Sequence, residues 1–118
     1  MRIEELTDPP DWLLNAKTYG ANVEIIDGCV QWLSGEWIRG TFEAGRWYDG
    51  VFYNGVFKGD WNDGTFYGGV FEAKSCHSID FKDGIWNTDC EPKTAINTAI
   101  LWAKLQQIAN QLKGLENA

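Results

Sequence analysis

Residues 35–57 read GEWIRGTFEAGRWYDGVFYNGVF, in which every fifth residue from Trp37 to Phe57 is Trp or Phe and a glycine lies two places before each of these five. The register continues in both directions, with a single four-residue step between Phe57 and Trp61. Twelve positions lie in it, eleven aromatic and one cysteine: Trp32, Trp37, Phe42, Trp47, Phe52, Phe57, Trp61, Phe66, Phe71, Cys76, Phe81 and Trp86. Because side chains alternate along a strand, this unit predicts very short strands with their aromatic residues on one face.

The residues before the repeat glycines predict how these strands are joined. Asp49-Gly50, Asn54-Gly55 and Asp63-Gly64 are pairs favoured in two-residue type I′ turns, where both positions need positive φ. Such turns would make Phe52 face Phe57 and would set Glu43 opposite Arg46. The sequence therefore favours a mainly β fold, an antiparallel meander with an aromatic ladder on one face, closed by a C-terminal helix.

The alternative is a β-solenoid with the same five-residue period. The Gly-x-aromatic spacing resembles that of pentapeptide-repeat proteins, which wind five residues per side into a square β-solenoid. Five tryptophans among the twelve positions would overfill a narrow lumen, and overpacking is costly. We therefore expect the meander rather than the solenoid.

A second resemblance rests on the Gly-x-Trp-x-x-Gly-x-Phe run, which is clearest at Gly35–Phe42 and Gly59–Phe71. This run is similar to MORN repeats, hairpin repeats that stack into an elongated single-layer sheet, and the likeness covers about half the chain. It implies a scaffold, a protein contact or a membrane-associated module. The pentapeptide-repeat resemblance implies a further role, because that family includes acidic DNA mimics.

The chain outside the repeat completes a single domain over residues 1–118, with a helical arm at 1–20, the β-repeat at 21–88 and a helix at 92–114. Pro10 begins a short predicted helix to about Lys17, which Gly20 would end. Asp27-Gly28 predicts a hairpin turn. In the last helix, a heptad-like spacing of apolar residues predicts self-association into a homo-oligomer through Leu101, Leu105, Ile108 and Leu112.

Charge and cysteine content indicate the kind of partner and compartment. The net charge is -7, which argues against direct nucleic-acid binding and permits docking on a basic protein surface. No apolar run approaches the ~20 residues of a membrane span, and no apolar segment follows Met1. Three cysteines, an odd number, suit a reducing cytoplasm, or the host cytoplasm if the protein is viral.

Candidate chemistry centres on Cys76 and His77, which could join Cys29 and Cys90 as zinc ligands. No Cys-x-x-Cys knuckle is present, so we predict no metal site. Cys76 and His77 are adjacent strand residues that point to opposite faces, so they cannot pair as nucleophile and base. We expect no enzymatic activity and no cofactor.

The residues predicted to contact a partner are four acids and three tyrosines: Glu43, Asp49, Asp60, Asp63, Tyr48, Tyr53 and Tyr67. Tyrosine favours protein interfaces because it combines a large apolar area with a polar tip. The predicted function is a non-enzymatic protein-binding module. Its narrower form is a small acidic, virus-encoded inhibitor that occupies a basic nucleic-acid-binding site on a host protein. The alternative is a structural scaffold or assembly subunit built on a rigid repeat.

Overall fold

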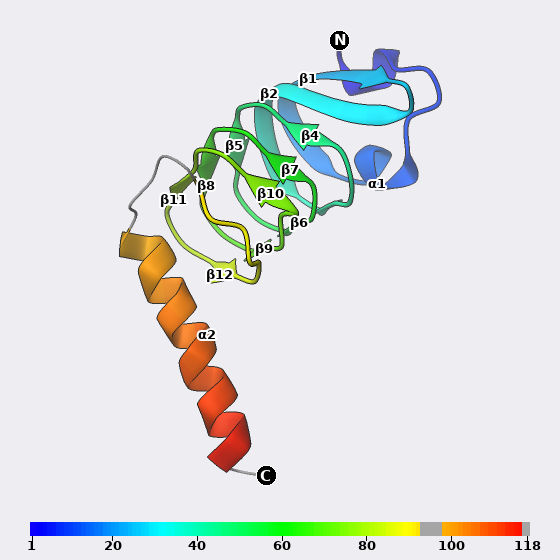
Figure 1. Ribbon diagram of the computed structural model, residues 1–118. Coiled ribbons are helices and arrows are strands. Elements are labelled where there is room, and N and C mark those ends of the chain that lie inside the picture. The colour runs from blue at the N-terminus through cyan, green and yellow to red at the C-terminus, as the bar shows by residue number, and fades with distance from the viewer. Residues whose placement is uncertain (93–97, 117–118) are drawn as a thin grey trace.

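The computed structural model describes residues 1–92 and 98–116, and most of them wind into a β-solenoid from which a C-terminal helix extends (Figure 1). The helices are η1 (Ile3–Glu5), α1 (Asp11–Leu14) and α2 (Thr98–Glu116). The strands are β1 (Lys17–Ile26), β2 (Cys29–Arg39), β3 (Thr41–Phe42), β4 (Arg46–Trp47), β5 (Val51–Phe52), β6 (Val56–Phe57), β7 (Asp60–Trp61), β8 (Thr65–Phe66), β9 (Val70–Phe71), β10 (Ser75–Cys76), β11 (Asp80–Phe81) and β12 (Ile85–Trp86).

The repeat strands form three columns, and within each column successive strands pair in parallel. Column one holds the first half of β2, then β4, β7 and β10. Column two holds the second half of β2, then β5, β8 and β11, and column three holds β3, β6, β9 and β12. The mainly β fold with a C-terminal helix is thus confirmed in its solenoid form. The antiparallel meander is wrong for the repeat.

Backbone conformation at the corners explains why the strands do not fold back as hairpins. A type I′ turn needs positive φ at both central residues. In the described residues only Asp27-Gly28 satisfies this, with φ of 51° and 76°, and it makes the predicted β1–β2 hairpin. At Asn54-Gly55 only the glycine is positive, at 118°. The chain therefore bends at each corner and continues in the same sense, so Phe52 pairs with Trp37 and Phe66 instead of Phe57.

The lumen accommodates its tryptophans because like rings stack from turn to turn. Trp47 lies parallel to Trp32 at 4.8 Å and to Trp61 at 5.1 Å between ring centroids, and all three are buried. Neighbouring columns meet edge to face, as Phe52 and Phe57 do at 87°. Both arrangements suit the ring quadrupole and add about 0.5–1.5 kcal/mol per pair. The expected overfilling does not occur: three side chains share each turn, and the large rings stack on those of the turn below.

The single four-residue step falls at the corner between columns three and one. There the Asp60 N–H donates to the Gly45 carbonyl at 2.9 Å, so the ladder continues across the shorter corner. A Cβ at Gly59 would lie 2.6 Å from that same oxygen, which explains the glycine. One turn of the solenoid is consequently 14 or 15 residues long, as the pairs Trp47–Trp61 and Trp61–Cys76 show.

The first turn is covered by the N-terminal segment. β1 pairs antiparallel with β2 and therefore protects the exposed edges of columns one and two. α1 covers the start of column three, where Trp12 meets the Phe42 ring edge to face at 4.9 Å and Leu13 is fully buried. The predicted helix at Pro10–Lys17 is shorter than expected. Gly20 does not end it, because Gly20 lies inside β1.

The C-terminal helix is confirmed as α2, which contacts β12 at the end of the solenoid (Figure 1). The predicted start at 92 leads into residues 93–97, which lie outside the described part of the chain. Ile100 is buried against the core, and the Lys104 ammonium lies 5.7 Å from the centre of the Trp86 ring. The inner side of α2 is thus docked while its outer side faces solvent.

Candidate functional site

Five of the seven predicted contact residues lie on two adjacent turns, three at the corner between columns one and two and two at the far end of column two. Tyr48 and Asp49 follow Trp47 in one turn, and Asp63 occupies the place of Asp49 in the next turn. Tyr53 and Tyr67 occupy equivalent places in column two. We call Tyr48, Asp49, Tyr53, Asp63 and Tyr67 the tyrosine–acid surface; all five are exposed.

The two tyrosines of column two form a stacked pair on the outside of the solenoid. The ring centroids of Tyr53 and Tyr67 are 5.3 Å apart with 10° between the planes, and the residues are 40% and 45% exposed. The Tyr53 hydroxyl donates to Oε1 of Glu36 at 3.2 Å. The charge of Glu36 raises the pKa of Tyr53, with smaller contributions from burial and this hydrogen bond, so the phenol stays protonated and donating. The sequence did not single out Glu36 as part of this site.

The two aspartates each have a structural role at their corner. Oδ1 of Asp49 accepts from the Gly50 N–H at 2.8 Å, and Oδ1 of Asp63 accepts from the Gly64 N–H at 2.7 Å. Asn54 makes the same bond to Gly55 at 2.8 Å, which shows that an amide oxygen can replace the carboxylate. The corner conformation therefore requires the side-chain oxygen of the aspartates but not their negative charge.

Glu43 and Asp60 do not join the tyrosine–acid surface. Glu43 follows Phe42 in column three, on another side of the solenoid. Asp60 lies in column one, where it pairs in register with Arg46 and accepts from the Ser75 hydroxyl at 2.8 Å. The expected Glu43–Arg46 pair is wrong, because it depended on hairpin pairing. The acids form no single row.

A second exposed feature is the outer side of α2. Leu101, Trp102, Leu105 and Ile108 are 54%, 65%, 59% and 54% exposed, and we call these four residues the α2 apolar face. It contains the predicted oligomerisation residues Leu101, Leu105 and Ile108. The side chain of Leu112 lies outside the described part. Trp102 was not among the predicted contact residues, although its place beside Leu101 could have indicated it.

The cysteines considered as zinc ligands, and then rejected, are divided between the two ends of the solenoid. Cys29 begins β2 at the first turn, whereas Cys76 lies in β10 at the last turn. Across residues 1–92 and 98–116, no three His, Cys, Asp or Glu residues are grouped as a metal site would require. The Sγ atoms of Cys76 and Cys90 are, however, 2.6 Å apart. The sequence analysis missed this contact.

Comparison with known proteins adds no relative to these observations. No protein-family model matches the chain, and no curated protein or solved structure is significantly similar to it. Among the described helices, none has the length and apolar character needed to cross a membrane. The fold itself defines the class: a three-column β-solenoid with an aromatic lumen, covered by a hairpin at one end and followed at the other by a helix that contacts β12.

Proposed function

We propose that this chain is a non-enzymatic protein-binding module that meets its partner with the tyrosine–acid surface. The observation that carries the proposal is the exposed Tyr53–Tyr67 stack, with Asp49 and Asp63 at the preceding corner of the same two turns. Stacking fixes the two rings in advance, so little side-chain entropy is lost when a partner covers them. Solenoid ladder bonds hold the backbone beneath them, as in the Tyr67 N–H to Phe52 carbonyl bond of 2.8 Å.

The charge around the rings favours a partner with a basic surface. Glu36 contacts Tyr53, Asp49 and Asp63 lie at the preceding corner of the same two turns, and Lys82, in register with Tyr67, is paired with Asp80. The whole chain carries a net charge of -7. Complementary charge speeds encounter and selects the partner. The narrower form of the proposal is an acidic, virus-encoded inhibitor that occupies a basic nucleic-acid-binding site on a host protein, in the cytoplasm. Because the acids form no single row, this form rests on the local acidic corner rather than on imitation of a whole phosphate backbone.

The test compares partner capture by charge variants that keep the fold. Asp49→Asn with Asp63→Asn removes two charges from the surface while each amide keeps its corner bond, as Asn54 does. Asp8→Asn with Asp27→Asn removes the same charge near the N-terminal end of the solenoid and is the matched control, because both residues are exposed and asparagine tolerates their positive φ. Each variant is used as bait in an affinity pull-down from host-cell extract, and the captured proteins are compared at low and high salt. Loss of a salt-sensitive partner with the first pair alone is expected, and equal capture by both pairs would contradict the proposal.

A second candidate function is favoured by the α2 apolar face: a structural or assembly subunit in which copies of the chain join through α2. Leu101, Leu105 and Ile108 follow the four-three spacing of a coiled-coil seam, which is complementary to a second copy of itself. Residues 92–118 carry three lysines and one glutamate, a net charge of +2 within an acidic chain. This segment is therefore less repelled by the acidic body of a second copy than the solenoid is.

Light scattering with size-exclusion chromatography tests this second function. Leu105→Asp should convert the assembly to monomer, because it buries a charge in the seam, whereas Gln106→Asp on the same helix should leave the assembly intact. A wild-type chain that is monomeric at concentrations of about 100 μM would exclude an interface of useful strength.

A further inference from the structure

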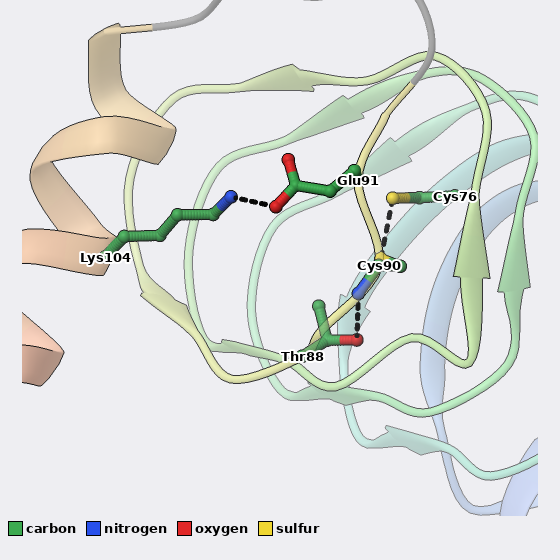
Figure 2. A network of polar contacts seen from close by, with 5 residues as sticks. All are labelled: Cys76, Thr88, Cys90, Glu91 and Lys104. Carbon is green, nitrogen blue, oxygen red and sulfur yellow. Dashed lines mark hydrogen bonds and ion pairs between the residues drawn. The ribbon is translucent and has the colours of Figure 1, made fainter.

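The last turn of the solenoid brings two thiols together. Sγ of Cys76 and Sγ of Cys90 lie 2.6 Å apart, and the residues are 14 positions apart in the chain (Figure 2). Trp47 and Trp61, paired in register in the same column, have the same separation. Cys90 therefore follows the interval of column one, and its sulfur lies against that of Cys76.

The segment that carries Cys90 also connects the solenoid to α2. The Cys90 backbone N–H donates to the Thr88 hydroxyl at 3.2 Å. That hydroxyl in turn donates to the Ala73 carbonyl of the turn below. The next residue, Glu91, pairs with Lys104 of α2 at 2.9 Å (Figure 2). A change at Cys90 is consequently one residue from an ion pair that joins this segment to α2.

We propose that Cys76 and Cys90 form a reversible disulfide in the presence of a low-molecular-weight disulfide, and that this bond fastens the base of α2 to the last turn of the solenoid. A disulfide is about 2.05 Å long, so the two sulfur atoms need to approach by only about half an ångström. The other thiol, Cys29, lies at the opposite end of the solenoid and does not compete.

The reaction proceeds by two thiol–disulfide exchanges. The Cys90 thiolate attacks one sulfur of the reagent, the reagent's sulfur–sulfur bond breaks, and one reagent thiolate leaves and takes a proton. Cys76 then loses its proton and attacks Cys90 Sγ, and the second reagent thiolate leaves. Two protein thiols are oxidised to one disulfide, and one reagent disulfide is reduced to two thiols.

The environments of the two thiols match these roles. Cys90 is partly exposed, while Cys76 is 9% exposed, so the reagent meets Cys90 first. The hydrogen bond from Cys76 lowers the pKa of the Cys90 thiol to about 7 against the effect of burial, and Thr88 and Lys104 add to the shift. The same contact, together with burial, raises the pKa of the Cys76 thiol. Cys90 is thus the attacking group and Cys76 the resolving group.

The test uses the full chain carrying Cys29→Ser, which leaves only the two thiols of interest. The reduced protein is incubated with oxidised glutathione, its remaining thiols are alkylated, and its intact mass is measured. We expect a monomer that has lost two hydrogens, carries no glutathione and no alkyl group, and returns to two thiols with dithiothreitol. Adding Cys76→Ser should trap one glutathione on Cys90. Persistent glutathione on the two-thiol chain, or disulfide-linked dimers, would overturn the proposal.

Hydrogen exchange tests the second half of the proposal. A disulfide closing a loop of about 15 residues raises a folding equilibrium constant about 150-fold in the chain-entropy model, which sets the upper limit for the slowing of exchange. Amides at the base of α2 and in β10 should exchange more slowly after oxidation, and amides of β1 should not change. A bond that forms without slowing exchange at the base of α2 would show that it fastens nothing.

Discussion

Replacement of Gly55 by alanine is the sharpest test of the parallel solenoid. A Cβ at Gly55 would lie 1.9 Å from the Gly40 carbonyl oxygen in the turn below, a distance that only backbone movement can relieve. That oxygen accepts from the Val56 N–H at 3.1 Å. Gly55 also has a φ of +118°, which side-chain-bearing residues rarely adopt. In a hairpin meander the neighbour across the turn would be different, and this clash would not arise.

The expected loss of stability follows from these contacts. Positive φ costs about 1–2 kcal/mol for an L-residue. Breaking the Val56–Gly40 bond costs about 1 kcal/mol, and more if the carbonyl stays buried. Separating the stacked Phe42 and Phe57 rings, now 4.9 Å apart, costs about 0.5–1.5 kcal/mol. Gly55→Ala should therefore lower the free energy of unfolding by about 2.5–4.5 kcal/mol, a large fraction of the stability of a small domain.

Gly28→Ala is the matched control. Gly28 also has positive φ, at +76°, but no atom lies within 4 Å of its added Cβ. Gly28→Ala should therefore lower the free energy of unfolding by only about 1–2 kcal/mol, the conformational cost of positive φ. Urea unfolding followed by tryptophan fluorescence measures both variants, since the core tryptophans become exposed on unfolding. Equal destabilisation by the two substitutions would refute the stacked-turn argument.

Three further predictions concern the lumen, the corners and the cysteine pair. Trp47→Ala should lower the free energy of unfolding by about 3–5 kcal/mol in the same assay, because it leaves a cavity between the rings of Trp32 and Trp61. Asp63→Ala should lower the free energy of unfolding by about 1 kcal/mol because it removes the hydrogen bond from the Gly64 N–H. Asp63→Asn should leave the free energy of unfolding unchanged, because the amide oxygen can accept the same bond. Alkylation of Cys90 by iodoacetamide should accelerate as the pH rises through about 7, because the thiolate reacts and the Cys76 hydrogen bond lowers its pKa to about 7. Cys76→Ala should move that midpoint upward, and an unchanged profile would contradict the assignment.

The β-repeat, the buried aromatic register, the Asp27-Gly28 hairpin and the C-terminal helix follow from the sequence because each depends on local chemistry. The pairing direction does not. Asp63-Gly64 satisfies the composition of a hairpin turn, yet only its glycine adopts positive φ, because the next turn of the solenoid supplies the hydrogen bonds that a hairpin partner would have made. Local turn preference was overridden by ladder pairing over 14 or 15 residues.

The candidate surfaces were predictable in composition rather than in position. Tyr53 and Tyr67 could be assigned to one side of a strand, but their stacking depends on the length of a turn. Glu43 was grouped with Asp49 because both are acids near repeat aromatics, and the three-column winding separates them. The Cys76–Cys90 contact could have been found from sequence, since its interval equals that of Trp47 and Trp61.

The chain repeats every five residues but winds once every 14 or 15, and this difference decides which insertions it can absorb. Inserting one extra five-residue unit after Phe57 would move every later strand on by one column. Trp61, which now lies above Trp47, would then lie above Phe52. The insertion would also rotate the departure of α2 by a third of a turn relative to the N-terminal hairpin. Three extra units would return Trp61 to column one and α2 to its original direction. Changes of length that preserve the direction of the helix therefore come in whole turns, which makes the number of units a determinant of how the two ends of the molecule are oriented.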